Sequence, residues 1–144
     1  MPDNAPGAPV SPAPITGLSH VQLVVPDVAA CTAWWTTALG LEQLYADDTG
    51  AVVALRHRQA NLVIVLSTPP APPASGASAT HLDHLAFAVS DRATLESWAA
   101  HLTAVGIDHP GIISERGRPS LQLVDPAGVH VELVAPASRE AFLR

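Results

Sequence analysis

Two histidines open two similar segments of the sequence. The first begins HVQLVV at 20–25 and the second begins HLAFAV at 84–89. Near the C-terminus, Glu132 interrupts the otherwise apolar segment HVELV. Two imidazoles and one carboxylate are the donors that a divalent first-row metal takes in a facial site, which leaves further positions open for a substrate or dioxygen. His20, His84 and Glu132 are therefore the candidate metal ligands, provided that the fold brings them together.

The histidine segments belong to a longer internal repeat. LSHVQLVVPDVAACTAWW at 18–35 returns as LDHLAFAVSDRATLESWA at 82–99, and ANLVIVLSTP at 60–69 resembles AGVHVELVAP at 127–136. Each copy begins with an alternating strand, followed by an aspartate that can cap a helix and by a glycine that can end it. The caps are Asp27 and Asp91, and the stops are Gly40 and Gly106.

Three strands are expected after each helix, because turn-forming residues recur at 47–50, 58–61, 115–119 and 125–128. Each half then has the order βαβββ. Neither half alone covers both faces of its sheet, so the helix covers one face and the other curves beside the sister sheet. We therefore predict an α+β fold of two repeated βαβββ units that form a concave mixed sheet.

The proline-rich stretches set the predicted boundaries. They give a disordered tail at 1–15, a first unit at 16–68, a linker at 69–80, a second unit at 81–136 and a C-terminal tail at 137–144. Within the helices, Trp34 and Trp98 are repeat-related and are expected to anchor helix to sheet, whereas Trp35 points elsewhere. The single Cys31 allows no internal disulfide and is most simply a core residue.

Alternation along the strands decides which side chains share the concave face. His20 and His84 lie opposite the apolar, helix-facing positions, and Glu132 joins them if the same parity holds in the last strand. The position in the first unit that matches Glu132 is Val65, which contributes no ligand. His130, two residues before Glu132, is a candidate general acid or base. Candidate substrate contacts are Gln22, Val65, Gln122 and Arg116.

A structural role for each of these polar residues is the alternative. A single strand histidine is more often hydrogen-bonded within the structure than a ligand, and a strand glutamate is usually solvated. Two histidines at equivalent positions of a repeat, together with a glutamate in an apolar strand, favour the metal site. Burying Glu132 without a partner would also be costly.

Composition excludes several classes of function. Only 14% of the residues are charged, the formal net charge is −6, and all seven basic residues are arginine. This balance argues against binding to nucleic acid. No apolar run is long enough to span a membrane, and the N-terminal stretch lacks the features of a secretory signal. We therefore expect a cytoplasmic protein whose partner is a small molecule.

The paired units with HVQLVV at 20–25, HLAFAV at 84–89, and DPAG leading into VELV at 125–134 resemble the vicinal oxygen chelate superfamily. This superfamily includes glyoxalase I, bleomycin-resistance proteins, fosfomycin-modifying thiol transferases, methylmalonyl-CoA epimerase and type I extradiol dioxygenases. The resemblance covers 16–136 and implies a glyoxalase/bleomycin resistance/dioxygenase-like fold. It also implies a homodimer and a metal held by His20, His84 and Glu132.

The resemblance further implies a metal-dependent enzyme whose substrate is chelated through adjacent oxygens. Val65 stands where glyoxalase and epimerase relatives usually add a carboxylate ligand, so dioxygenase-like chemistry with Fe(II) is preferred, with Mn, Ni, Co or Zn as alternatives. Tyr45 is a poor match to the tyrosine of ring-cleaving relatives, and only Arg116 and Arg118 could meet an anionic substrate as in the fosfomycin enzymes. The alternatives are a non-catalytic antibiotic- or metabolite-binding protein, and a metal-dependent isomerase, lyase or thiol transferase.

Overall fold

The two repeats form the same elements in the same order. The computed structural model describes residues 13, 18–69 and 82–137. The first unit contains β1 (His20–Val24), α1 (Val28–Leu39), β2 (Glu42–Ala46), β3 (Val52–His57) and β4 (Leu62–Ser67). The second contains β5 (His84–Ala88), α2 (Arg92–Ala104), β6 (Ile113–Glu115), β7 (Arg118–Val124) and β8 (His130–Val134).

The segments expected as tails and linker lie almost wholly outside the described residues. Of the ranges 1–15, 69–80 and 137–144, only residues 13, 69 and 137 are described. The described parts, 18–69 and 82–137, correspond to the two repeats.

The helices begin where the capping signals predict. The Asp27 carboxylate accepts a hydrogen bond from the backbone N–H of Ala30 at 2.9 Å, and Asp91 accepts one from Thr94 at 2.7 Å. Gly40 ends α1 in the left-handed conformation, with φ of 73°. In α2 the cap is Val105. The two aspartates thus set where the helices begin, and Gly40 sets where α1 ends.

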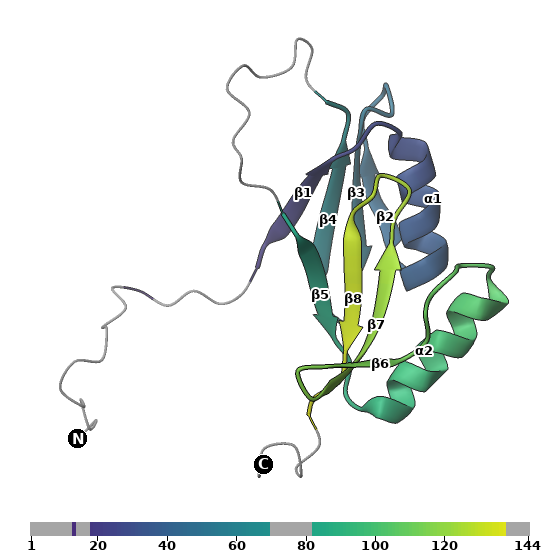
Figure 1. Cartoon of the computed structure of the whole chain (residues 1–144). Coiled ribbons are helices and arrows are strands. Elements are labelled where there is room, and N and C mark those ends of the chain that lie inside the picture. The colour runs from purple at the N-terminus through teal and green to yellow at the C-terminus, as the bar shows by residue number, and fades with distance from the viewer. Residues whose placement is uncertain (1–12, 14–17, 70–81, 138–144) are drawn as a thin grey trace.

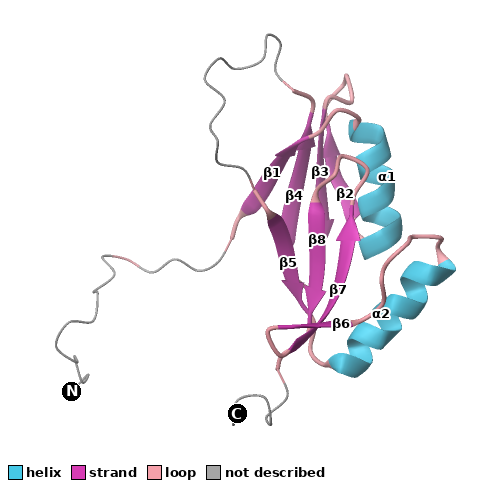
Figure 2. Ribbon diagram, viewed as in Figure 1, coloured by secondary structure: helices cyan, strands magenta, loops and turns pink. Residues whose placement is uncertain are grey.

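Each unit forms its own four-stranded mixed sheet. The strand order is β1-β4-β3-β2 in the first and β5-β8-β7-β6 in the second, and in both the first strand is parallel to the last while the other neighbours are antiparallel. Both helices lie on the same side of the strands in the view of Figures 1 and 2. The α+β fold of paired βαβββ units is confirmed. Among the described strands, β1 and β5 are each at a sheet edge.

The helix-facing sides of the two sheets contribute to one hydrophobic core. The alternating apolar residues of the central strands are almost fully buried, and so is Cys31 at 1% exposure. Burial of each large aliphatic side chain contributes about 1.5–3 kcal/mol. The buried apolar strand residues are Leu23, Val53, Leu55, Ile64, Leu66, Leu121, Leu123, Val131 and Leu133.

The burial of the two tryptophans of α1 differs from the expectation. Trp34 is half-buried and packs against the core, but Trp35, which was expected to point elsewhere, is fully buried and is the larger anchor of this helix. The indole N–H of Trp35 donates to Asp125 Oδ2 at 3.2 Å, and its ring packs edge-on against Phe87 with centroids 6.2 Å apart. Both partners belong to the second unit. Trp35 is buried because α1 packs against the second unit as well as against its own sheet.

Neither described helix is long and apolar enough to cross a membrane.

Candidate functional site

The pairing register places four polar side chains on the face of the second sheet that is turned away from the core. His84 is opposite His130, and Glu132 of the same strand is opposite Gln122 on its other side. Because directly paired residues of neighbouring strands project to the same face, these side chains form one polar surface. His130 itself is exposed.

His84 and Glu132 form the centre of this surface. The imidazole Nε2 of His84 lies 3.7 Å from Glu132 Oε2, and Nδ1–H donates to Asp83 Oδ2 at 2.7 Å. The Glu132 side chain is 12% exposed and that of His84 is 40% exposed. The hydrogen bond to Asp83, aided by the nearby charge of Glu132, raises the pKa of His84. With Nδ1–H held by a carboxylate, Nε2 of the neutral ring offers its lone pair toward Glu132.

The second oxygen of Glu132 is held from the neighbouring strand. The carboxamide Nε2 of Gln122 donates to Glu132 Oε1 at 3.3 Å and to Glu115 Oε2 at 3.4 Å. Gln122 therefore lies between two carboxylates and supports the orientation of Glu132. This contact is available only because the register places Gln122 directly opposite Glu132.

His20 lies in the other sheet. It is exposed, and its Nδ1 is 3.0 Å from the hydroxyl of Ser19. The described residues contain no group of three or more His, Cys, Asp or Glu side chains placed to hold a metal ion. The structure thus brings His84 and Glu132 together within the chain and leaves His20 apart from them.

The matching position in the first sheet has the expected apolar residue. Val65 pairs with Gln22, just as Glu132 pairs with Ala86 in the second sheet, so the two positions are structurally equivalent. The side chain of Gln22 donates to the hydroxyl of Ser67 at 3.0 Å. The first sheet therefore has Val65 at the position of the Glu132 carboxylate, and the Gln22 amide at the position of Ala86.

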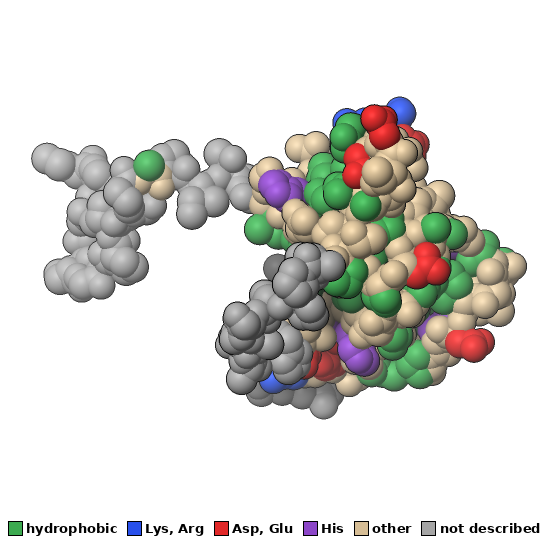
Figure 3. Space-filling model, turned by 90° about the horizontal axis from the view of Figure 1, so that it is seen from above, with side chains coloured by type: hydrophobic (Ala, Val, Ile, Leu, Met, Phe, Trp, Pro, Cys, Tyr) green, Lys and Arg blue, Asp and Glu red, His purple; other side chains and the backbone are tan. Residues whose placement is uncertain are grey.

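Arginine side chains border the His84–Glu132 pair. A pocket of about 390 Å³ is lined by both residues of the pair together with Arg116 and Arg118, and apolar residues including Val134 complete its wall. Arg116 lies in the tight turn between β6 and β7, with φ of 50°. Basic side chains are sparse on the face shown in Figure 3. Two guanidinium groups therefore share this pocket with the carboxylates of Glu132 and Glu115.

Two contributors to this surface were missed from the sequence, Asp83 and Glu115. Asp83 precedes β5, so the alternation of the strand did not apply to it, although its place next to His84 was a signal. Glu115 is the last residue of β6, a strand of only three residues, and pairs with Arg118. Alternation over so short a strand gives little information about the face.

The pair fits part of a metal site. A divalent first-row ion bonds to imidazole nitrogen and carboxylate oxygen at about 2.0–2.2 Å, so two donors 3.7 Å apart can share one ion. The carboxylate on the far nitrogen of His84 is the usual outer partner of a ligating histidine. His84 and Glu132 supply two of the three donors of the predicted set.

Paired βαβββ units, each with a polar face turned away from the core, define the structural class of this chain. The model of the Glyoxalase/Bleomycin resistance protein/Dioxygenase superfamily matches residues 17–133, and the chain belongs to this superfamily. The resemblance noted from the sequence motifs is thereby confirmed. No curated protein matches the chain.

Solved structures show the same fold at low sequence identity. Lactoylglutathione lyase from Agrobacterium tumefaciens is 22% identical, with a TM-score of 0.68 over 85% of this chain and 96% of that one. A glyoxylase/bleomycin resistance protein/dioxygenase domain from Frankia sp. is 21% identical, with a TM-score of 0.68 over 88% and 96%.

A third relative is a variant of the fosfomycin resistance protein FosX from Listeria monocytogenes, complexed with Mn(II) and 1S,2S-dihydroxypropylphosphonic acid. It is 20% identical, with a TM-score of 0.63 over 90% and 97% of the two chains. At these identities the likeness establishes the fold alone.

Proposed function

We propose that the protein is a metal-dependent enzyme that binds a small anionic substrate through adjacent oxygens. The observation that carries this proposal is the His84–Glu132 pair, with donors 3.7 Å apart and the far nitrogen of His84 held by Asp83. His84 and Glu132 would hold the ion together with His20. A divalent ion in such a set acts as a Lewis acid on the chelated oxygens or, as Fe(II), supports oxygen-dependent chemistry, which is the preferred reaction class.

The third ligand is proposed to come from a second copy of the chain. β1 and β5 are edge strands, so a β1 edge of one copy can pair with the β5 edge of the other. Exposed apolar side chains in and just before these strands support this arrangement: Leu18 is 73% exposed, Val24 57% and Leu82 54%. Such pairing would bring His20 of one copy to the open face that carries His84 and Glu132 in the other. The protein would therefore be a homodimer with two equivalent sites.

The chain's own side chains are assigned the following roles. Arg116 and Arg118 attract and orient the anionic end of the substrate in the pocket beside the pair. His130 lies opposite His84 and lines an adjoining pocket of about 280 Å³ with Glu132, where it can hold or release a proton. Val65 keeps the equivalent position of the first sheet apolar, and Gln22 offers an amide to the substrate.

A non-catalytic binding protein is the second candidate function. The pocket beside the pair also has apolar walls from Phe87, Val89 and Val134, which favour ligand binding even without a metal. Dioxygen consumption, substrate turnover and ligand retention, each measured with and without metal, distinguish the two candidates. An oxygenase consumes dioxygen only with metal bound, an isomerase, lyase or thiol transferase turns over substrate without consuming dioxygen, and a binding protein retains its ligand after chelation of all metal.

The direct test is the metal content of anaerobically purified protein, with Glu132→Gln as the variant. The wild-type chain is expected to bind about one first-row divalent ion, and the Glu132→Gln chain to lose at least about 90% of it, because a neutral amide is a far weaker ligand than a carboxylate. Elemental analysis after dialysis measures this. Equal metal in the folded variant and the wild type would contradict the proposal.

Gln122 is expected to act as a positioning residue for Glu132. In Gln122→Leu the two hydrogen bonds to Glu132 and Glu115 are lost, so the ligand carboxylate is freer to rotate. We expect metal affinity to fall by about 10-fold, as for other groups that orient a ligand. Competition with a fluorescent chelator measures it. Gln43→Leu on the exposed strand β2 is the matched control and should bind metal as the wild type does; an equal affinity in both variants would contradict the role.

A further inference from the structure

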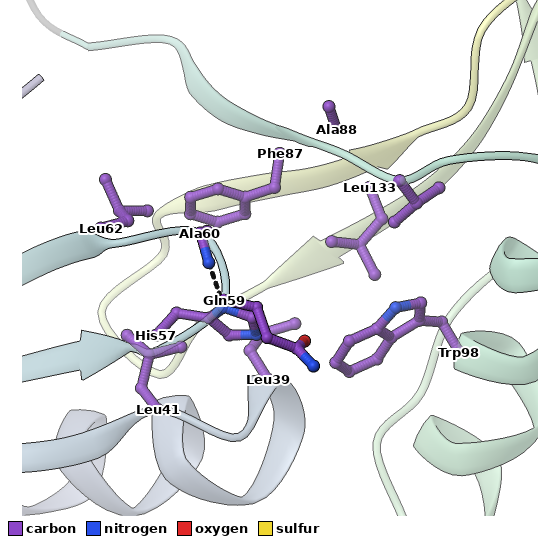
Figure 4. Close-up of a pocket in the computed structure, with 11 residues that line it drawn as sticks. Leu39, Leu41, His57, Gln59, Ala60, Leu62, Phe87, Ala88, Trp98 and Leu133 are labelled. Carbon is purple, nitrogen blue, oxygen red and sulfur yellow. Dashed lines mark hydrogen bonds between the residues drawn. The ribbon is translucent and has the colours of Figure 1, made fainter. Parts of the chain in front are cut away.

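An apolar hollow lies between the two units and apart from the His84–Glu132 pair (Figure 4). Its volume is about 300 Å³. This hollow and the pocket beside the pair have three lining residues in common, Phe87, Ala88 and Val89, at the end of β5 and just after it. None of the proposed metal ligands lines the hollow. The walls come from the end of α1, the β3–β4 turn, β5, α2 and β8. The principal apolar contributors are Leu39, Leu41, Leu62, Phe87, Trp98 and Leu133.

Besides the indole of Trp98, the polar side chains that line this hollow are His57, the last residue of β3, and Gln59 of the β3–β4 turn. Nδ1 of His57 accepts a hydrogen bond from the backbone N–H of Ala60 at 3.2 Å. A neutral imidazole that accepts at Nδ1 carries its proton on Nε2, so His57 can donate from that atom. Figure 4 shows the carboxamide of Gln59 pointing toward the ring of Trp98. A ligand between them would therefore meet a donor from His57 and both a donor and an acceptor from Gln59.

The size and the walls define the ligand that fits. An apolar cavity of about 150 Å³ holds one benzene ring, so a hollow of about 300 Å³ accommodates two fused rings. Trp98 and Phe87 are half-buried, which leaves part of each ring for aromatic contact. Aromatic pairs gain free energy beyond that of area burial when they stack offset or meet edge to face. A flat aromatic ligand is thus favoured over a branched aliphatic one.

We propose that this hollow is a binding site for a planar, two-ring aromatic molecule that carries one hydroxyl or carbonyl group. The rings lie among Trp98, Phe87 and the leucines, and the oxygen is hydrogen-bonded by Gln59 and His57. The site is separate from the proposed metal centre and does not depend on a metal ion. It would bind aromatic metabolites even if the substrate of the metal centre is a different compound.

The test uses 2-naphthol as the probe and naphthalene as its comparison. Full-length protein is titrated in the presence of a chelator, with binding followed by naphthol fluorescence and by amide shifts in two-dimensional NMR. We expect saturable 2-naphthol binding, with shifts centred on Gln59, Ala60 and Trp98. The affinity for naphthalene should be about tenfold weaker, since it forms no hydrogen bond.

Two variants test the location and the polar contact. Ala60→Trp keeps the backbone N–H that His57 accepts from, yet places a large ring in the exposed mouth of the hollow, so it should abolish binding. Gln59→Leu should bind 2-naphthol about tenfold more weakly and naphthalene no more weakly than the wild type does. Gln43→Leu, on the exposed strand β2 and not among the residues that line the hollow, is the matched control.

The outcomes are distinct from those for the metal centre. Binding that persists in the chelator and in Glu132→Gln but is lost in folded Ala60→Trp supports the proposal. It would be overturned by non-saturable binding, by shifts centred on His84 and Glu132, or by equal affinity of wild-type and Ala60→Trp protein. Loss of metal binding in a separate experiment on Glu132→Gln bears only on the proposed function.

Discussion

A mixed dimer of His20→Ala and Glu132→Ala chains is expected to regain metal that neither variant binds alone. If β1 of one copy pairs with β5 of the other, each site takes His20 from one chain and His84 with Glu132 from its partner. In the mixed dimer one site lacks both His20 and Glu132, while the other is complete. The expected metal content is therefore about half that of the wild type, as the two-fold symmetry requires.

The experiment needs chains with two different affinity tags, co-expressed and purified in succession so that only mixed dimers remain. The control pairs His84→Ala with Glu132→Ala. Both residues lie in the same unit, on neighbouring strands β5 and β8, so neither chain has a complete second unit and no site is restored. Failure of the first mixture, with metal still lost in each single variant, would place all three ligands within one chain. Recovery in the control mixture would contradict the assigned ligand pair.

The sequence was sufficient to predict which residues share the open face of each sheet. Strand alternation has a strict period of two, and the repeat fixes the same phase in both units, so the parity of His84 and Glu132 followed from HLAFAV and HVELV alone. It did not predict how the two sheets lie relative to each other. That depends on which edges and which helix faces meet, and neither alternation nor repeat symmetry contains this information.

The tryptophans of α1 show the same limit. Trp34 and Trp98 are equivalent in the repeat, which made Trp34 the expected anchor. Repeat symmetry describes one unit at a time, whereas α1 also contacts the sister unit, and Trp35 faces that contact. Asp125 was predicted only as a turn residue in DPAG, and its second oxygen was found to reach across to Trp35. Contacts between units are where the sequence-based predictions failed.

Asp125 is therefore expected to be among the most important polar residues for stability. It is 3% exposed, and its Oδ1 accepts the backbone N–H groups of Ala127 and Val129 at 2.9 and 2.8 Å, while Oδ2 accepts the indole N–H of Trp35. Asp125→Ala would leave these three donors without that acceptor. Since a buried unsatisfied group costs about 1–3 kcal/mol, we expect the free energy of unfolding to fall by about 3 kcal/mol or more.

Urea denaturation followed by far-UV circular dichroism measures this loss, and Trp35→Phe separates its two parts. That variant removes the indole N–H between the units together with part of a buried ring, and it keeps both hydrogen bonds in the turn, so its loss of stability is an upper limit for the contribution of the contact between the units. Asp48→Ala, in an exposed turn of the first unit, is the control and should change stability by no more than about 0.5 kcal/mol. If Asp125→Ala were no less stable than Asp48→Ala, the contact between α1 and the β7–β8 turn would not hold the units together. A steep loss in Asp125→Ala with a smaller one in Trp35→Phe would show that this carboxylate fixes the turn and the position of α1 at once.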